Sequence, residues 1–156
     1  MSTKFEIVPA GRVYANQLAP HLRVQDQIEI WASSGMAPLE ALLDSVDVSD
    51  DDMCWAALLN KLPVAMFGCN EIAENVGGIW MLCSPAIYTN KRDFMRHCTH
   101  YLKVMHERYE FLTNFVDARN IPSMAWLPRL GFIPVQSVDE FGYGKKPFVQ
   151  YVSKRS

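Results

Sequence analysis

The sequence predicts a single α+β domain with a central mixed, mostly antiparallel sheet flanked by helices. Two patterns and the chain length predict this fold class. Three short apolar runs rich in strand formers follow one another between residues 53 and 83, which favours consecutive antiparallel strands. The stretch from Asn90 to Tyr109 then repeats apolar residues along one helical face. The length of 156 residues suits one domain over residues 1–156.

The N-terminal part predicts a strand followed by helices. Lys4–Val8 (KFEIV) has the composition of a short strand. Arg12–Trp31 follows a period near 3.6 residues, and Pro20 is expected to bend or break its first part. Pro38–Ser45 predicts a second short helix opened by its proline. The acidic run over residues 45–52 predicts a solvated turn, because it lacks the glycine and spaced carboxylates of a calcium loop.

The rest of the chain alternates strands with two helices. Asn120 is expected to cap the second of these helices, whose first turn tolerates Pro122. The predicted order of elements is therefore β, α, α, β, β, β, α, β, α, β, β. The strands after residue 50 are predicted over Met53–Asn60, Pro63–Asn70, Val76–Cys83, Phe111–Val116, Phe132–Val135 and Pro147–Val152.

Composition favours an ordinary folded protein and argues against several kinds of partner. Hydrophobic residues make up 49% of the chain and charged residues 21%. The net charge of −2 shows no basic excess that would indicate nucleic acid. The apolar runs are far shorter than the roughly 20 residues that cross a bilayer, and the N-terminus lacks the apolar core of a signal peptide. We therefore expect no membrane anchor and a cytoplasmic location.

Cysteine and histidine spacing predicts neither disulfides nor a metal site. No two cysteines stand in a C-x-x-C spacing, so we expect reduced and mostly buried thiols. His97 and His100 share a helical face, but no third ligand points the same way. The four cysteines are Cys54, Cys69, Cys83 and Cys98.

The element order resembles the GNAT acetyltransferase superfamily. Its members carry an Asn at a helix start and a Gly-Phe pair after the helix, at the spacing from Asn120 to Gly131-Phe132. More narrowly, the chain is similar to a phage family of GNAT-like proteins that includes internal virion protein A of T7-like podoviruses. The segments that carry this narrower resemblance are Leu22–Gly35, Pro38–Ser45, Gly77–Cys83, Asn114–Asn120, Trp126–Phe132 and Pro147–Val152.

The resemblance implies an acetyl-CoA site between two splayed strands. In GNAT enzymes the pantetheine arm pairs along a strand edge, and the pyrophosphate lies at the start of the next helix. Family members have a glycine-containing loop there, whereas Ser84–Asp93 has no glycine and contains Pro85. Because of this departure, the sequence does not decide whether the chain binds acetyl-CoA. The positions implied to bind the cofactor are Met81, Leu82, Cys83, Asn90, Lys91, Arg92 and Asn120.

The same resemblance shows where catalytic groups are missing or unassigned. Many GNAT enzymes use a tyrosine seven residues after the helix-starting Asn to protonate the departing thiolate, and here that position is Leu127, which cannot donate a proton. Trp80 or Met81 is a candidate to fill the gap between the strands. Asn120 either bonds a pantetheine amide or only caps its helix, and the sequence leaves both open.

No general base can be assigned from the sequence. The spacing of Arg23, Asp26 and Glu29 predicts a surface ion-pair array. In a GNAT fold this helix borders the acceptor cleft, so these three residues are the implied site for an acceptor or partner. The candidate bases are Glu29, Glu71, Glu74 and Asp117, and Tyr88 and Tyr101 are further acids or hydrogen-bond donors.

Two functions follow from the resemblance. The first is a phage GNAT-like protein that acts by binding other virion proteins in the host cytoplasm or the virion, with acetyl transfer degenerate or lost. The second is a working acetyl-CoA-dependent N-acetyltransferase, of phage or bacterial origin, that acts on an amine or protein. Coenzyme binding at micromolar concentration would favour the second.

Overall fold

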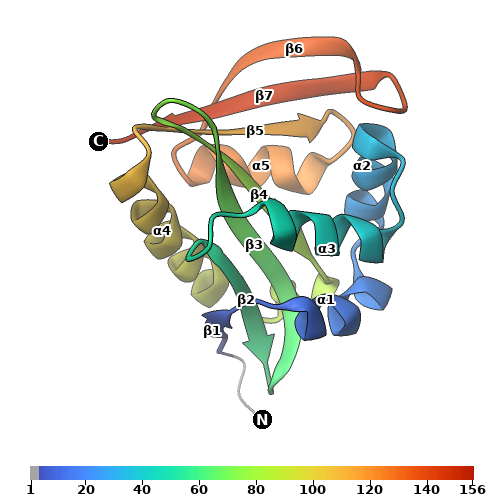
Figure 1. Cartoon of the computed structure of the whole chain (residues 1–156), viewed down its shortest axis with the longest axis vertical. Coiled ribbons are helices and arrows are strands. Elements are labelled where there is room, and N and C mark those ends of the chain that lie inside the picture. Colours follow the sequence, from blue (N-terminus) through green and yellow to red (C-terminus); the bar gives the residue numbers. More distant parts are fainter. Residues whose placement is uncertain (1–3) are drawn as a thin grey trace.

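The chain folds around one seven-stranded sheet with the strand order β1-β2-β3-β4-β5-β7-β6 (Figure 1). The computed structural model describes residues 4–156. Only β4 and β5 pair in parallel, and the other neighbours are antiparallel. This confirms the predicted mixed, mostly antiparallel sheet. The strands are β1 (Glu6–Pro9), β2 (Cys54–Leu59), β3 (Leu62–Ala73), β4 (Val76–Cys83), β5 (Phe111–Asp117), β6 (Ile133–Phe141) and β7 (Lys146–Lys154).

Helices cover both faces of the sheet. One face packs against α1 (Arg12–Leu18), α2 (Val24–Ser34) and α3 (Pro38–Val48), and the other against α4 (Lys91–Arg108) and α5 (Ile121–Arg129) (Figure 1). The alternation of side chains along β3 supplies both cores, because Met66 packs on the first face and Phe67 on the second. Two 3₁₀ turns complete the chain, η1 (Ala19–His21) and η2 (Pro85–Asn90).

Pro20 breaks the predicted N-terminal helix instead of bending it. The region predicted as one helical stretch forms α1, the turn η1 and α2, since proline lacks the N–H that a continuous helix needs. The acidic run is only partly a turn. Helix α3 continues through Val48, and Val46 packs against the core, so burial of that side chain carries the helix past the predicted end at Ser45.

Strands β4 and β5 diverge after a short contact. They pair only from Val76–Gly78 to Phe111–Thr113, after which neither strand pairs with the other. Gly77 lies at this junction, where an added Cβ would come within 2.6 Å of the Cys69 sulfur and the Tyr109 ring. The close approach of the Cys69 and Tyr109 side chains therefore requires glycine at the junction. Beyond it, the two strands leave a V-shaped gap that opens toward Cys83 and Asp117.

Candidate active site

The backbone N–H and C=O groups of Ile79 and Met81 face the gap between the diverging strands. Opposite Ile79 on β3, Cys69 makes its backbone hydrogen bonds on the β2 side. Backbone groups of successive residues point to alternate edges of a strand, so Ile79 and Met81 turn theirs away from β3. Ser84 fits the same alternation, because its N–H bonds back to β3. β4 therefore offers a free strand edge over these two residues.

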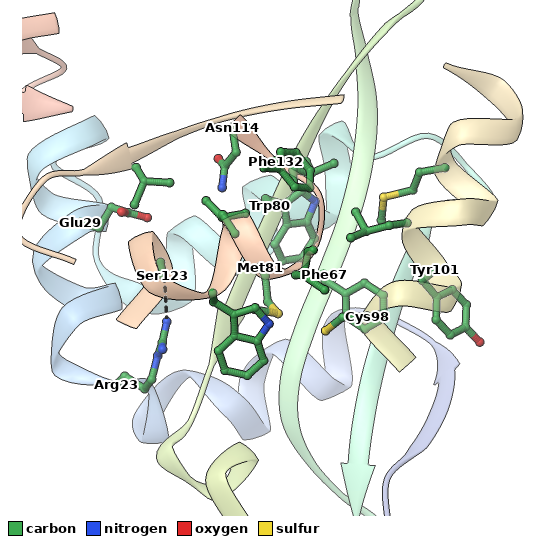
Figure 2. Close-up of a pocket in the computed structure, with 17 residues that line it drawn as sticks. Arg23, Glu29, Phe67, Trp80, Met81, Cys98, Tyr101, Asn114, Ser123 and Phe132 are labelled. Atoms are coloured by element: carbon green, nitrogen blue, oxygen red, sulfur yellow. Dashed lines mark hydrogen bonds between the residues drawn. The ribbon is translucent and has the colours of Figure 1, made fainter. Parts of the chain in front are cut away.

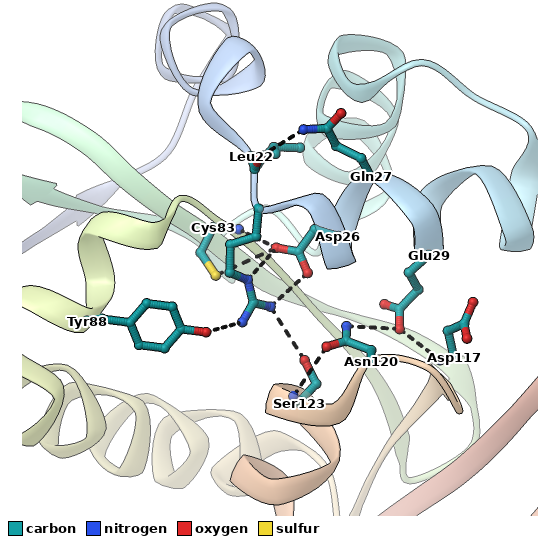
Figure 3. A network of polar contacts seen from close by, with 10 residues as sticks. Leu22, Asp26, Gln27, Glu29, Cys83, Tyr88, Asp117, Asn120 and Ser123 are labelled. Carbon is teal, nitrogen blue, oxygen red and sulfur yellow. Dashed lines mark hydrogen bonds and ion pairs between the residues drawn. The ribbon is translucent and has the colours of Figure 1, made fainter.

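The segment that begins α2 crosses the wide end of the gap (Figure 3). The backbone N–H of Arg23 donates to the carbonyl oxygen of Cys83 at 2.9 Å. Asp26 Oδ2 accepts the N–H of the same Cys83 at 3.0 Å. One turn later, Glu29 Oε1 accepts the backbone N–H of Asp117, at the end of β5, at 2.8 Å. This helix therefore bonds to the ends of both strands.

Arg23 and Asp26 form a buried ion pair, with 3% and 1% of each residue exposed. Two hydrogen bonds join the side chains, at 2.8 and 3.1 Å, and Arg23 also donates to the Tyr88 hydroxyl at 2.9 Å. Burial opposes the charge of Arg23, but its hydrogen bonds to Asp26 and Tyr88 and the negative charge around it together raise its pKa. The predicted pairing is present, but the prediction of a surface array is wrong, because tertiary packing covers this helix face.

Glu29 lies apart from that pair and has its own partners. It is half-buried, and its Oε1 accepts from the Asp117 N–H and from Asn120 Nδ2, the latter at 3.3 Å. Burial is the main reason that the pKa of Glu29 rises from 4.5 to about 7, and the charges of Asp26 and Asp117 add to it. A carboxyl group with this pKa can both accept and release a proton near neutral pH.

Two cavities meet at the gap from opposite faces of the sheet. The inner cavity, about 80 Å³, lies between the sheet, α4 and α5 (Figure 2). The outer cavity, about 470 Å³, lies between the sheet, α2 and α3. The residues that line both are Glu29, Ile79, Trp80, Met81 and Asn114. The two cavities therefore adjoin at these five residues.

Trp80 and Asn114 shape the junction between the cavities. The Trp80 indole N–H donates to Ser49 Oγ at 2.8 Å, which holds the ring on the α3 side as a wall. Asn114 points into the space between Glu29 and Trp80 (Figure 2), and no side-chain hydrogen bond of Asn114 is formed with residues 4–156. Sequence reasoning missed Asn114, although a polar residue within an apolar strand was a signal that could have drawn attention to it.

The start of α4 is capped. Asn90 Oδ1 accepts the backbone N–H of Asp93 at 3.2 Å, so a side chain of the preceding residue closes this helix end. Asp93 is itself buried and bonds to the backbone N–H of Phe5 at 2.8 Å. Lys91 Nζ lies 5.3 Å from the centre of the Tyr88 ring. Lys91 and Arg129 line a third cavity between α4 and α5, the surface cavity, and bring two positive charges to it.

Comparison with known proteins identifies the fold. No protein-family model and no curated protein sequence matches the chain. Among solved structures, a GNAT-family acetyltransferase from Bacillus anthracis matches at 13% identity and a TM-score of 0.73, over 97% of this chain and 95% of that one. A putative phosphinothricin N-acetyltransferase matches at 12% identity and 0.74, over 98% and 99%. The aminoglycoside acetyltransferase AAC(6')-Ib in complex with coenzyme A matches at 15% and 0.67, over 97% and 95%. The chain has the GNAT acetyltransferase fold.

The predicted cofactor positions of this GNAT fold differ in what they offer. The backbone groups of Met81 face the gap. Leu82 has the opposite orientation, and its side chain is buried in the core on the face of the sheet that α1, α2 and α3 cover. The gap-facing backbone groups of Cys83 are already bonded to α2 and its N-cap. Asn120 caps α5 through its side chain and also donates to Glu29. Arg92 is exposed and lines none of the three cavities.

The remaining candidates from the sequence lie outside the junction. Glu71 and Glu74 are exposed. Asp117 is buried, and although burial opposes ionisation, its bonds to Arg119 lower its pKa. Leu127 is buried and lines the inner cavity. Within residues 4–156, no group of three His, Cys, Asp or Glu side chains is placed to hold a metal, and no helix is long and apolar enough to cross a membrane.

Proposed function

We propose that this chain is an acetyl-CoA-dependent N-acetyltransferase in which Glu29 is the general base. The observation that carries the proposal is the position of Glu29 at the junction of the inner and outer cavities. A base at such a junction would lie beside an amine held in one cavity and beside the carbonyl carbon held in the other. The amine attacks this carbon. Proximity of two reactants in adjoining cavities also lowers the barrier to aminolysis of a thioester.

The inner cavity suits the pantetheine arm of the cofactor. Ile79 and Met81 offer a free strand edge, to which an extended chain with amide groups can pair. The Trp126 indole Nε1 is buried and has no partner among the described residues, and Trp126 lines both the inner and the surface cavity. An unpaired buried donor is costly, and an amide carbonyl of the bound arm would satisfy it if it lay beside Trp126. The inner cavity must widen to accept the arm, because its present volume is about 80 Å³.

The surface cavity suits the phosphates of coenzyme A. Lys91 and Arg129 supply two cations there, and cations recognise phosphate without the glycine loop that other family members use. The backbone N–H of Asp93 is taken by the Asn90 cap, so helix α4 contributes fewer free donors. This arrangement predicts binding that is weaker and more dependent on salt than binding by a backbone loop.

Acetyl-CoA, when bound, supplies the thioester whose acetyl group is transferred. Glu29 in its ionised form takes the proton that the attacking nitrogen loses as its bond to the carbonyl carbon forms. Asn114 presents an unpaired amide at the junction, where it can hydrogen-bond the carbonyl group. Leu127 has no acidic proton to donate, so the departing sulfur would take its proton from solvent as the carbon–sulfur bond breaks. The transferred acetyl group leaves as the amide of the acceptor.

Titration calorimetry with acetyl-CoA, combined with release of free thiol in the presence of amines, tests this function. We expect binding at micromolar concentration, and thiol release that requires both an amine and Glu29. A Lys91→Ala/Arg129→Ala variant should bind acetyl-CoA more weakly, with a smaller dependence on salt. Binding that is undetectable at millimolar acetyl-CoA contradicts the proposal.

A role in virion assembly remains a prediction. It depends on the resemblance of six segments to the phage GNAT-like family. The capped start of α4 and the leucine at position 127 favour reduced catalysis, so they are the features that support a binding role. Failure of acetyl-CoA to bind would make this the better account, and co-purification with virion proteins from infected cells would test it.

A further inference from the structure

We propose that the outer cavity takes a primary amine whose ammonium group is joined to an aromatic or apolar body and which carries no carboxylate. This inference depends on the proposed function, because it assigns the acceptor class of the same site. It is carried by the charges and the side chains that line the outer cavity, together with the position of Glu29 at its inner end.

The charge of the outer cavity favours a cationic acceptor. The charged residues that line it, among those described, are Glu29 on α2 and Asp44 on α3, so both are acidic. Asp44 is exposed on α3, and Glu29 is half-buried at the junction. An ammonium group is therefore attracted along the cavity toward Glu29. It loses one proton to solvent to become a nucleophile, and Glu29 takes the second proton as the bond to the carbonyl carbon forms. A carboxylate on the acceptor meets no cation in this lining and is repelled by both acids.

The body of the acceptor meets apolar and aromatic side chains. Phe115 and Phe141 stack with their ring centres 5.0 Å apart, and Phe141 lies 4.5 Å from Phe148. These three rings come from the adjacent strands β5, β6 and β7 and form one wall of the outer cavity. The held indole of Trp80 lines the same cavity. Removal of apolar surface from water on such walls favours an aromatic acceptor over a small polar amine.

The junction at Glu29 orients the acceptor. Glu29 Oε1 is held by the Asp117 N–H and by Asn120, so its position at the inner end of the cavity is fixed by backbone and side chain together. The three rings belong to the strands at the β5 edge of the gap. An amine with its nitrogen at Glu29 therefore extends its body along β5 toward these rings, which suits a short linker between nitrogen and ring.

A matched pair of amines tests the acceptor class. 2-Phenylethylamine and phenylalanine share the ring, the linker and an amino group of similar basicity, and differ by the carboxylate. We expect kcat/KM for 2-phenylethylamine to exceed that for phenylalanine by about tenfold or more, since Glu29 and Asp44 both repel the carboxylate of phenylalanine. Ethylamine, which lacks the ring, should also be about tenfold poorer.

Two variants separate the charge from the aromatic wall. Asp44→Lys should improve phenylalanine relative to 2-phenylethylamine, because it supplies a cation for the carboxylate. Phe141→Ala should lower kcat/KM for 2-phenylethylamine about tenfold and leave ethylamine within about twofold. Calorimetry without acetyl-CoA measures the affinity of the wild-type and Phe141→Ala proteins for 2-phenylethylamine. It therefore tests the contact with Phe141 independently of catalysis.

The failures of the two proposals are distinguishable. Turnover of phenylalanine equal to or faster than that of 2-phenylethylamine overturns the acceptor class and leaves the acetyltransferase proposal standing. The same holds if Phe141→Ala affects ethylamine as much as 2-phenylethylamine. Absence of acetyl-CoA binding overturns the proposed function itself, whatever amines bind to the outer cavity.

Discussion

Replacement of Glu29 by glutamine should remove activity and stabilise the fold at the same time. Glutamine keeps the size of the side chain and an oxygen that can accept from Asp117 and Asn120. It cannot take a proton from an amine, so kcat should fall by about 10²- to 10⁴-fold, the usual contribution of a general base. The wild-type kcat should rise with pH through about 7 as Glu29 ionises, and the variant should lose that dependence.

The gain in stability follows from the raised pKa of Glu29. In the folded chain the pKa is about 7 against an ordinary value of 4.5, so between these pH values the folded state binds more protons than the unfolded state. The free energy of unfolding of the wild type therefore falls as pH rises from about 4.5 to about 7. At about 1.4 kcal/mol for each pH unit of difference, the loss above pH 7 is at most about 3.5 kcal/mol. The glutamine variant avoids it.

Urea denaturation of both proteins at pH 5 and pH 8 measures this difference, and thiol release from acetyl-CoA measures kcat. Glu71→Gln is the matched control, because Glu71 is an exposed carboxylate away from the junction, and it should change neither quantity. A Glu29→Gln protein that keeps kcat within about threefold of the wild type would refute the assignment of the base. Equal stability of Glu29→Gln and the wild type at pH 8 would refute the raised pKa.

Two further substitutions test the contacts that hold the site in place. Asp26→Asn leaves the buried Arg23 without its counter-ion and should lower the free energy of unfolding by about 3–5 kcal/mol in chemical denaturation. The control Asp47→Asn breaks an exposed pair with Arg12 and should lower it by about 1 kcal/mol or less. Similar losses from both would contradict burial of the Arg23 pair. Gly77→Ala places a Cβ within 2.6 Å of two side chains and should lower stability by about 1–3 kcal/mol. The control Gly11→Ala has open space around its Cβ, and a larger loss there than at Gly77 would argue against the close approach at the strand junction.

Local patterns were enough to predict most of the fold. Apolar runs of strand length mark β2, β3 and β4, and the repeat of apolar residues from Asn90 to Tyr109 marks α4. The Asn90 cap was predictable because it acts within one helical turn. The end of α3 was not, since Val46 is held by the core and not by its neighbours in sequence. Burial of the Arg23 face was missed for the same reason.

The candidate site was only partly predictable. Arg23, Asp26 and Glu29 were singled out by spacing and by the family resemblance, but their roles were not separable. The three residues lie close together on α2 and its N-cap, yet Asp26 bonds to β4 and Glu29 bonds to β5. Asn114 was overlooked although it is a polar residue within an apolar strand, because only the tertiary structure places it at the junction of the two cavities.

The sequence by itself determined the succession of strands, the two helices after residue 90, an interruption of the first helical stretch at Pro20, the missing glycine before α4 and the missing acid at position 127. These features depend on single residues and on short repeats, so they can be recognised without the tertiary structure. Tertiary structure alone decided that Glu29 meets Asp117, 88 residues away, at the junction of two cavities. The proton affinity of a carboxyl group depends on the water and charges around it, and those are set only when distant segments pack together.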